Sequence, residues 1–479
     1  MSTAARRADW PWLITLCGIA LLVRVYGIDT YALDLDEATS IDMASRELSR
    51  LRYVGVHPPL YYLSLRAWLA LGDDEVVVRS LSTLFSVMTV PFVYLLGRAV
   101  AGRGVGLVAA VLFVVSPLQI REAQNARMYA LLTLSAVLAM WGLARVLPRV
   151  EDARSGPTAR AWLPYLLGCT LALYTHNAAI LLVLACSVVV LSTAPSAADP
   201  SRVFRSWLIV HAAVGVLMLP WLRRMLAQYR RVLDTFWIPA PDPERIVAVL
   251  QALYVGGPVH GLAAFVAVSI ATLALLGAWS LRRSPERLLL PAALLGLPIL
   301  AALLISVVRP IFAPRTLVWT TVPLSLLVAA GIVALRPRAL RPAALATIAA
   351  MQLLGLVGYR ADIPIEDWDR AASQVAEHAD ARDRVVLAAG YTIAPFGYYY
   401  RRFQGSAPLL PAGTGFITDE VVRTVVAQLE GAERVWLVYS HEGYADADGR
   451  MLGALRTLGT EIESHQFARI DVYLFDTTP

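Results

Sequence analysis

The chain has no lysine, so all 42 of its basic residues are arginines, and only 16% of its 479 residues are charged. Soluble domains carry about 25% charged residues. The arginines are scattered between apolar segments and form no basic patch, which argues against a nucleic-acid surface. With 57% hydrophobic residues and a mean hydropathy of +0.58, the composition indicates a polytopic membrane protein.

Cysteine is also scarce. Cys17, Cys169 and Cys186 all fall inside apolar runs, which argues against a disulfide framework and a thiolate metal site. The first apolar run follows Arg6 and Arg7, and no small-residue cleavage site comes after it. We therefore expect this run to remain as the first span and not to be removed as a signal peptide.

Hydropathy predicts about eleven membrane spans, each near the roughly 20 residues that a spanning helix needs. They lie near 11–28, 76–97, 104–118, 128–147, 161–175, 177–193, 207–222, 258–281, 288–308, 315–335 and 340–358. The apolar stretch 57–72 is short and begins near two prolines. We expect it to form an interfacial or re-entrant helix.

Arginine placement predicts the orientation. If the N-terminus is inside, alternate loops hold 16 arginines and few acids, which is the positive-inside pattern. These are Arg6, Arg7, Arg98, Arg103, Arg145, Arg149, Arg154, Arg160, Arg202, Arg205, Arg282, Arg283, Arg287, Arg336, Arg338 and Arg341. The outer face then receives 33–44, 121–129, 175–178, 223–257, 309–316 and everything after 360.

The chain changes character after residue 360. Predicted helices at 367–383, 418–432 and 448–459 alternate with predicted strands at 384–389, 434–440 and 468–476. This alternation predicts a small extracytoplasmic α/β domain over 361–479, beside a membrane domain over 1–360. The segment has no GxGxxG or Walker A motif, so we assign it no nucleotide.

Three acids crowd the mouth of the first span. Asp34, Asp36 and Glu37 lie in "LDLDEATS". The adjacent carboxylates of Asp36 and Glu37 repel each other, and membrane topology requires neither of them. Ionisable groups near the membrane default to functional candidates. The outer segments add Arg121, Arg127, Arg315, His57 and His176.

Several of these residues also have a purely structural interpretation. Arg121 is compatible with a snorkelling interface residue, and His176 with a satisfied helix-end histidine. Arg24 lies within the first span, where it either snorkels to the same surface or pairs with an acid.

A carboxylate beside arginines on the outer face suits glycosyl transfer from a lipid-phosphate sugar. Nucleotide sugars are absent outside the cytoplasm, so a lipid must carry the sugar. A carboxylate can act as general base for the acceptor hydroxyl. Arginine offers the departing phosphate a planar donor fork that is always charged.

Four segments carry a resemblance to a known family: "RVYGIDTYALDLDEATS" (24–40), "HPPLYYLSLRAWLALGDDEVVVRSLSTLFSV" (57–87), "SPLQIREAQNARMYALL" (116–132) and "LYTHNAAILL" (173–182). In order and spacing they resemble family 39-type members of the GT-C glycosyltransferase superfamily. That group includes the protein O-mannosyltransferases and the bacterial aminoarabinose transferase. The resemblance implies a mostly α-helical GT-C membrane fold with interfacial helices and the small outer domain.

The resemblance also implies roles for individual residues. The family's catalytic aspartate falls on Asp36, and Glu37 would orient this base, bind acceptor or ligate a metal. Donor phosphate and lipid binding falls on Arg127, Arg315, His57 and Tyr129, with His176, Glu122, Asn125 and Arg24 as supporting residues.

Two departures from the family pattern fall near these positions. Asn125 stands where Glu is usual, although Glu122 lies one helical turn earlier and offers a substitute. Thr316 follows Arg315 where Tyr is usual. We therefore carry no sugar or acceptor specificity across.

We expect an inverting glycosyltransferase of the bacterial cytoplasmic (inner) membrane, active on the outer face. It would move a hexose or pentose from a polyprenyl-phosphate donor to a protein, lipid or glycan, without nucleic acid. Asp34, Asp36 and Glu37 offer oxygen ligands to a divalent metal, but no spacing dictates a closed site. A transporter or flippase, or a silent scaffold that binds lipid-linked sugar, stays open. In the scaffold interpretation, Tyr398–Arg402 would form an aromatic and basic edge against lipid headgroups.

Overall fold

The structure, a computed structural model, describes residues 9–46, 57–147, 159–197, 199–232, 241–256, 263–361, 366–413 and 415–478. The chain divides into two compact units. Unit 1 comprises Met1–Gly27, Glu47–Gly72 and Val77–Ile363, and unit 2 comprises Ile28–Arg46, Asp73–Val76 and Pro364–Pro479. The acidic segment after the first apolar run therefore belongs to unit 2, which also holds the C-terminal α/β region.

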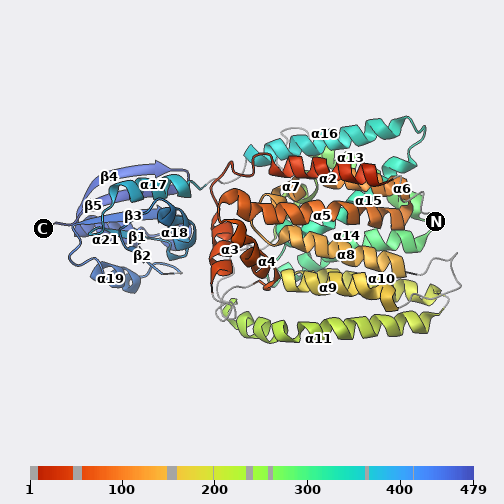
Figure 1. Cartoon of the computed structure of the whole chain (residues 1–479), viewed down its shortest axis with the longest axis horizontal. Helices are drawn as coiled ribbons and strands as arrows, with labels where there is room; N and C mark the ends of the chain where they lie inside the picture. Colours follow the sequence, from red (N-terminus) through yellow and green to blue (C-terminus); the bar gives the residue numbers. More distant parts are fainter. Residues whose placement is uncertain are drawn as a thin grey trace. The chain divides into compact units, whose positions relative to one another are not determined.

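Unit 1 is built of helices (Figure 1). They are α2 (Trp10–Val25), α4 (Leu60–Trp68), α5 (Glu75–Ala101, whose first two residues belong to unit 2), α6 (Arg103–Val115), α7 (Pro117–Ala123), α8 (Tyr129–Val146), α9 (Leu163–Thr175), α10 (Ala179–Thr193), α11 (Pro200–Val232), α12 (Pro243–Tyr254), α13 (Ala263–Leu281), α14 (Pro285–Ser306), α15 (Thr321–Ala334) and α16 (Leu340–Ala361). Short 3₁₀ turns lie at η2 (Leu69–Leu71), η3 (Ala159–Trp162), η4 (Ala194–Ser196) and η5 (Pro314–Thr320).

The prediction of a multi-pass membrane protein is confirmed. Within the described ranges, eight helices are long and apolar enough to cross a bilayer, or nine if the bent pair α6 and α7 is one span. Helix α2 has 16 residues and α9 has 13, which is short for a span. The figure of eleven spans and the orientation stay predictions.

Three predicted segments differ in detail. The expected span at 104–118 breaks at Ser116 into α6 and α7. Much of the expected loop at 223–257 is helical, in the end of α11 and in α12. The stretch 57–72, for which we expect an interfacial or re-entrant helix, contains α4, which begins directly after Pro59 and is too short to span. Its place relative to the membrane stays a prediction.

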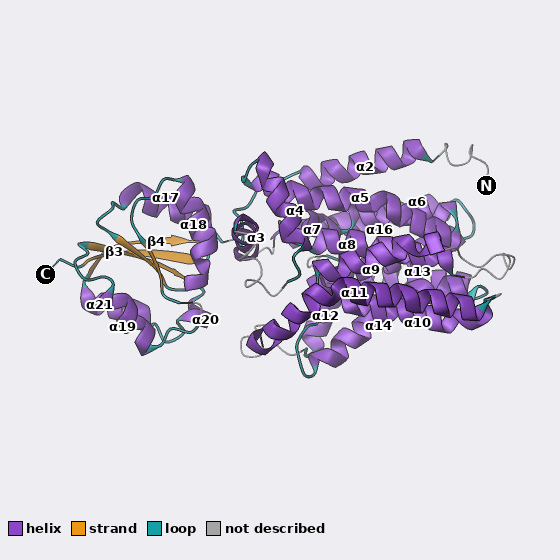
Figure 2. Cartoon of the chain, turned by 60° about the horizontal axis from the view of Figure 1, so that its bottom comes forward, coloured by secondary structure: helices purple, strands orange, loops and turns teal. Residues whose placement is uncertain are grey.

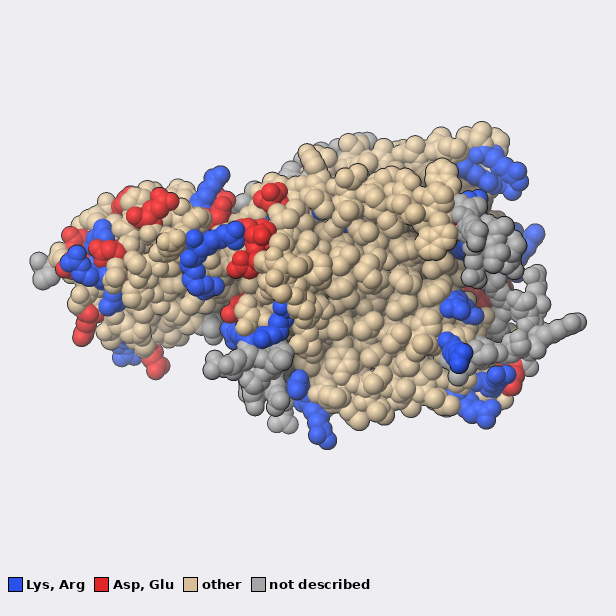
Figure 3. Space-filling model, viewed as in Figure 1, with Lys and Arg blue, Asp and Glu red and all other residues tan. Residues whose placement is uncertain are grey.

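Small residues bring neighbouring helices of unit 1 together. An added Cβ on Gly277 of α13 would lie 1.9 Å from the Leu327 carbonyl oxygen of α15, and one on Gly331 would lie 2.0 Å from the Leu273 carbonyl oxygen. Such backbone contact is how membrane helices gain packing energy without a hydrophobic driving force. The face of unit 1 in Figure 3 carries a broad band without charged side chains, with arginines beyond its end.

Unit 2 contains a mixed five-stranded sheet in the order β2-β1-β3-β5-β4. Its strands are β1 (Arg384–Leu387), β2 (Leu409–Pro411), β3 (Arg434–Ser440), β4 (Thr460–Phe467) and β5 (Ile470–Asp476). β2, β1 and β3 are parallel, with Val385 opposite Leu409 and Trp436. β5 runs antiparallel to both β3 and β4.

Helices cover both faces of this sheet (Figure 2). α17 (Trp368–His378) and α18 (Ile393–Arg402) lie on one face, and α19 (Asp419–Ala427) and α21 (Arg450–Leu458) on the other. The unit also holds α3 (Leu35–Ser45), η6 (Gly390–Thr392) and α20 (Glu442–Ala445). The core under α19 and α21 alternates along β3 as Val435, Leu437 and Tyr439. The predicted α/β domain is thus present, and sequence analysis missed α18, β2 and β4.

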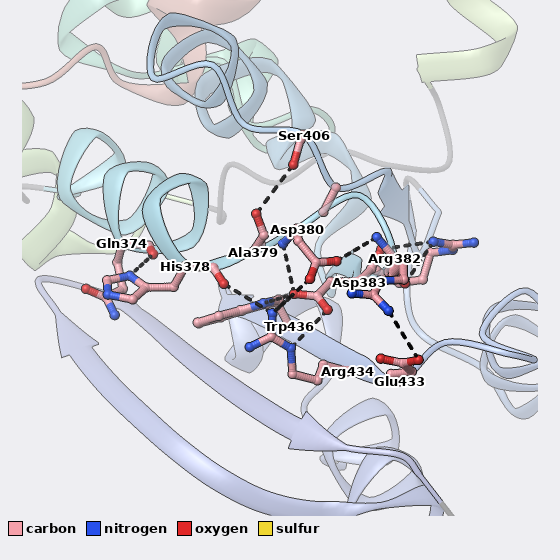
Figure 4. Close-up of polar contacts among 12 residues, drawn as sticks. Gln374, His378, Ala379, Asp380, Arg382, Asp383, Ser406, Glu433, Arg434 and Trp436 are labelled. Carbon is pink, nitrogen blue, oxygen red and sulfur yellow. Dashed lines mark hydrogen bonds and ion pairs between the residues drawn. The ribbon is translucent and has the colours of Figure 1, made fainter.

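A buried carboxylate joins the first residues of β1 and β3 (Figure 4). Asp383 is 1% exposed, and its two oxygens accept hydrogen bonds from Arg434 at 3.0 and 2.8 Å. The indole N–H of Trp436 donates to the same carboxylate at 3.2 Å. Since β1 and β3 are central strands, this contact ties the middle of the sheet together.

We expect Asp383→Ala to destabilise unit 2 by about 2–4 kcal/mol, because Arg434 and Trp436 lose their shared acceptor. Hydrogen exchange of the β1 and β3 amides in the full-length protein measures this change. Asp380→Ala is the matched control, since Asp380 is half exposed and 3.7 Å from Arg434, and should cost less than about 0.5 kcal/mol. Equal exchange in the two variants would contradict this assignment.

Candidate active site

A broken helix carries the outer-loop motif of unit 1. Pro117 disfavours the helical conformation at Ser116, whose ψ is 120°, and α6 and α7 meet at a bend of 59°. After α7 the chain turns through residues 124–128 and enters α8 at Tyr129. The bend places the motif of residues 121–129 in a short helix and a turn.

Arg24 stabilises this break. Its guanidinium is fully buried and donates to Ser86 Oγ at 2.8 Å and to the carbonyl oxygens of Val114 at 3.1 Å and Phe113 at 3.3 Å. These carbonyls lie in the last turn of α6, where regular helical partners run out, and the Phe113 carbonyl also accepts from the Ser116 N–H at 3.4 Å. Both expectations for Arg24 are wrong in the described contacts: it neither snorkels nor pairs with an acid, but caps a helix end.

Backbone carbonyls at the end of α2 and hydroxyl side chains of α5 position the turn that follows. The amide of Gln124 donates to the carbonyl oxygens of Arg24 at 3.0 Å and Tyr26 at 2.8 Å, at the end of α2. Hydroxyls of α5 reach the same region, Ser82 to the Arg127 carbonyl at 3.1 Å and Thr83 to the Ala123 carbonyl at 2.8 Å. Hydrogen bonds to the end of α2 and to α5 thereby hold the backbone around Arg127.

Two histidines and Tyr129 meet within unit 1. The ring centroids of His57 and His176 are 5.0 Å apart, and those of His176 and Tyr129 are 5.9 Å apart. His176 Nδ1 accepts a hydrogen bond from the Ala178 N–H at 3.0 Å, so this nitrogen carries no proton. The buried Nδ1 of His57 has no hydrogen-bond partner among the described residues.

Two arginines act on both imidazoles. Burial lowers the pKa of His176 to about 3, and the charges of Arg127 and Arg315 add to this. Burial lowers the pKa of His57 well below its usual range, and His176, Arg127 and Arg315 lower it further. Arg127 is itself buried. The structure therefore brings four of the predicted residues, from four separate segments, into one cationic cluster with neutral imidazoles.

Arg315 is held by a short turn between α14 and α15. It follows Pro314 at the start of η5, and Thr316 Oγ donates to the carbonyl oxygens of Ile311 and Ala313 at 2.8 Å. Ser306 Oγ accepts from the N–H groups of Ile311 and Phe312 at 2.9 Å. Thr316, the departure from the family pattern, thus stabilises the loop that presents Arg315.

Glu122 and Asn125 differ in their surroundings. Glu122 is buried in α7, where its Oε1 lies 3.7 Å from Arg121 Nε. The buried Oδ1 of Asn125 accepts no hydrogen bond from any described residue. A buried polar atom without a partner costs about 1–3 kcal/mol unless water or a ligand satisfies it. Asn125 Oδ1 and His57 Nδ1 are therefore the candidate ligand-binding atoms.

Unit 2 carries the acidic segment. Asp34 caps α3 and forms a capping box with Glu37: Asp34 Oδ1 accepts from the Glu37 N–H at 2.7 Å, and Glu37 Oε2 accepts from the Asp34 N–H at 3.2 Å. Glu37 is buried and Asp36 is half-buried in the same first turn. The described contacts give Glu37 a structural part in positioning that turn.

Tyr399 stabilises this segment, and sequence analysis missed it. Its hydroxyl accepts from the Leu33 N–H at 2.8 Å and donates to Glu75 Oε1 at 2.9 Å, while Tyr398 donates to the Asp73 carbonyl at 2.7 Å. Tyr398, Tyr399 and Tyr400 are all buried. The aromatic edge expected against lipid headgroups is therefore wrong. The sequence signal for this contact was the run of three tyrosines, whose buried partners lie far away along the chain.

The predicted metal gains no support within the described residues, where no group of three or more His, Cys, Asp or Glu side chains is arranged to hold one. One oxygen of Asp34 and one of Glu37 accept the hydrogen bonds of the capping box.

Comparisons with known proteins agree with this architecture. Residues 56–223 match the family described as dolichyl-phosphate-mannose-protein mannosyltransferase. ArnT from Cupriavidus metallidurans in the apo state matches with a TM-score of 0.69 and 12% identity, over 98% of each chain. The chain has the GT-C glycosyltransferase fold. The resemblance drawn from the sequence is confirmed at the level of the fold.

Two further structures share the GT-C fold. The archaeal oligosaccharyltransferase AglB from Archaeoglobus fulgidus has a TM-score of 0.57 and 12% identity, over 98% of this chain and 74% of AglB. The arabinofuranosyltransferase AftD from Mycobacteria has a TM-score of 0.54 and 15% identity, over 98% of this chain and 40% of AftD. No curated protein matches the chain in sequence.

We expect His57 and His176 to stay neutral at about pH 5, where an ordinary histidine with a pKa near 6.5 is mostly protonated. Nitrogen-15 NMR of histidine-labelled protein in nanodiscs, assigned with His57→Gln and His176→Gln, measures the protonation. The unfolded chain binds a proton near pH 6.5 and the folded chain does not. The His176 contribution to the free energy of unfolding therefore falls as the pH drops from 6.5 towards 3.

Arg127→Gln tests whether the arginine charge contributes to the lowered pKa of His57 and His176. Removing that charge should raise the pKa of both imidazoles. A titration midpoint above about pH 6 for either histidine in the unsubstituted protein would contradict the assignment.

Proposed function

We propose that the chain is a membrane glycosyltransferase that takes a monosaccharide from a polyprenyl-phosphate donor on the outer face of the bacterial cytoplasmic membrane. The observation that carries this proposal is the cluster of Arg127 and Arg315 around two neutral imidazoles. A cluster with two permanent charges and no proton to lose favours an anionic ligand over the whole physiological pH range.

The lipid-linked donor also has support from two proteins of the same fold. One ArnT structure from Cupriavidus metallidurans holds undecaprenyl phosphate, and the AglB structure holds a dolichol-phosphate. Both ligands join a polyisoprenoid to a phosphate. The apolar helices of unit 1 suit such a lipid, and the arginine cluster suits its phosphate.

In the proposed reaction the acceptor hydroxyl oxygen attacks the anomeric carbon, and the bond from that carbon to the phosphate oxygen breaks. Asp36 takes the hydroxyl proton, as the resemblance to family 39-type enzymes implies. Arg127 and Arg315 stabilise the charge that develops on the leaving phosphate. A single displacement of this kind inverts the anomeric configuration. The capping box of Asp34 and Glu37 keeps Asp36 in the first turn of α3.

We expect Asp36→Asn to reduce turnover at least about 10³-fold while the fold is kept, because the amide has the same size and cannot accept the proton. Purified protein in nanodiscs is given radiolabelled polyprenyl-phosphate mannose, glucose, galactose, arabinose and aminoarabinose, and sugar release or transfer is followed. Asp42→Asn is the matched control on the same helix, since Asp42 forms an exposed pair with Arg46 at 2.6 Å, and should retain activity. Near wild-type turnover in Asp36→Asn would refute the base assignment.

We expect Arg127→Gln and Arg315→Gln each to reduce kcat by about 10²–10³-fold, because each removes a donor to the leaving phosphate. Single-turnover kinetics with the donor that the wild type accepts measure this loss. Arg121→Gln serves as the control, since Arg121 lies beside Glu122 and is partly exposed, and should change kcat by less than about threefold. If all three variants behaved alike, the arginine cluster would not be the phosphate site.

A further inference from the structure

The carboxyl ends of three parallel strands meet at one edge of the unit 2 sheet. The described segments that follow β1, β2 and β3 are 388–392, 412–413 with 415–418, and 441–446. They touch one another: a Cβ on Gly390 would lie 2.1 Å from the Gly413 carbonyl oxygen, and the Ile417 N–H donates to the Ala445 carbonyl at 2.8 Å. Ligands of parallel sheets bind at this edge, where loops from several strands converge.

A polar cluster occupies this edge and has no part in the proposed transfer. His441 Nε2 lies 2.9 Å from Glu366 Oε1, and His441 Nδ1 lies 3.1 Å from the Tyr391 hydroxyl. The other Glu366 oxygen accepts from the Trp368 indole N–H at 2.8 Å. The rings of Tyr391 and His441 are stacked with centroids 5.5 Å apart. Glu366 and Tyr391 thus hold the His441 imidazole directly, and Trp368 holds it through Glu366.

The backbone at this point is strained. His441 has a φ of +54°, which is uncommon for a residue other than glycine and recurs at ligand sites. The preceding Ser440 ends β3 with a buried hydroxyl that makes no hydrogen bond among the described residues.

Two exposed aromatic side chains lie on the same loops. Phe416 is 66% exposed and Tyr444 is 42% exposed, and their ring centroids are 5.1 Å apart. The Tyr444 N–H donates to the His441 carbonyl at 2.9 Å, and Tyr444 contributes to the raised pKa of Tyr391, after burial. The aromatic pair therefore borders the polar cluster. Large aromatic surface left in water marks a binding surface.

The charges around this edge are mostly negative. Glu366 acts on Tyr391, Glu442 acts on Tyr439 and Asp471, and Arg469 acts on Glu366. Burial alone would raise the pKa of Glu366, but its hydrogen bonds to His441 and Trp368 leave this pKa lowered, so the carboxylate is ionised near neutral pH. Such a surface disfavours phosphates, anionic lipids and nucleic acids.

We propose that these residues form a binding site for an uncharged sugar chain. This site rests on the proposed function, because the bound sugar chain would be the acceptor glycan. The apolar C–H face of a pyranose or furanose ring stacks on Phe416 and Tyr444. Its hydroxyls donate to the remaining lone pairs of the Glu366 carboxylate and of the Tyr391 hydroxyl, which His441 holds in place. This assigns the α/β region of unit 2 a recognition role and selects glycan among the acceptor classes.

The test uses the full-length protein in nanodiscs on an array of neutral, anionic and amino-substituted oligosaccharides, with titration calorimetry of each one bound. We expect the wild type to bind at least one neutral oligosaccharide and Phe416→Ala/Tyr444→Ala to bind it at least tenfold more weakly. Tyr444→Phe should bind it like the wild type. Phe403→Ala is the matched control, since Phe403 is 42% exposed at the other end of α18, and should also bind normally.

Three outcomes would overturn the proposal: no oligosaccharide is bound, equal binding is measured in wild type and the double variant, or only anionic or amino-substituted oligosaccharides bind. Hydrolysis of the lipid-phosphate sugar in the same samples separates the two proposals. The double variant should hydrolyse donor at the wild-type rate. Saccharide binding without donor turnover would refute the proposed function alone, and donor turnover without saccharide binding would refute this site alone.

Discussion

A helix that ends inside an apolar layer must have its last carbonyl groups satisfied by the protein, because hydrocarbon offers no hydrogen bonds. The break between α6 and α7 creates this demand, and the buried guanidinium of Arg24 meets it at Phe113 and Val114. Only because these carbonyls are satisfied can α7 turn away and the following turn present Arg127. The motif of residues 121–129 thus depends on a cation in the first helix, about a hundred residues earlier.

In the cluster of unit 1 the charge is carried by arginines, and the histidines stay neutral. Arg127 and Arg315 keep their charge at any physiological pH, and their field, added to burial, keeps His57 and His176 neutral. Neutral imidazoles can donate and accept hydrogen bonds without adding charge to a site that already holds two arginines. In our proposal this arrangement suits a phosphate that gains negative charge as the sugar leaves. A transporter that bound and released protons would need the opposite design, in which these imidazoles titrate.

Unit 2 gives the neighbouring acids different tasks. Asp34 and Glu37 complete a capping box and stabilise the first turn of α3, whereas Asp36 between them is left for chemistry in our proposal. From the sequence we expect Asp36 to be the base and Glu37 to orient it, bind acceptor or ligate a metal, and the capping box shows that Glu37 also has a structural part. Tyr399 supports the same turn through the Leu33 N–H and Glu75, so the buried tyrosine run of α18 contributes to the position of Asp36.

The sequence by itself determined the membrane class, the α/β character after residue 360, and the candidate set of Asp36, His57, Arg127, His176 and Arg315, because hydropathy, period and charge are local properties. It predicted β3 and α19 but missed β4, whose largely exposed residues carry no apolar alternation. Tertiary structure alone decided that the span at 104–118 breaks, that Arg24 caps this break, that Glu37 is a capping residue and that His441 joins Glu366 and Tyr391. The contacts of Arg24 and His441 join residues 50 to 90 positions apart, and hydrogen-bond satisfaction between such partners leaves no periodic trace in the chain.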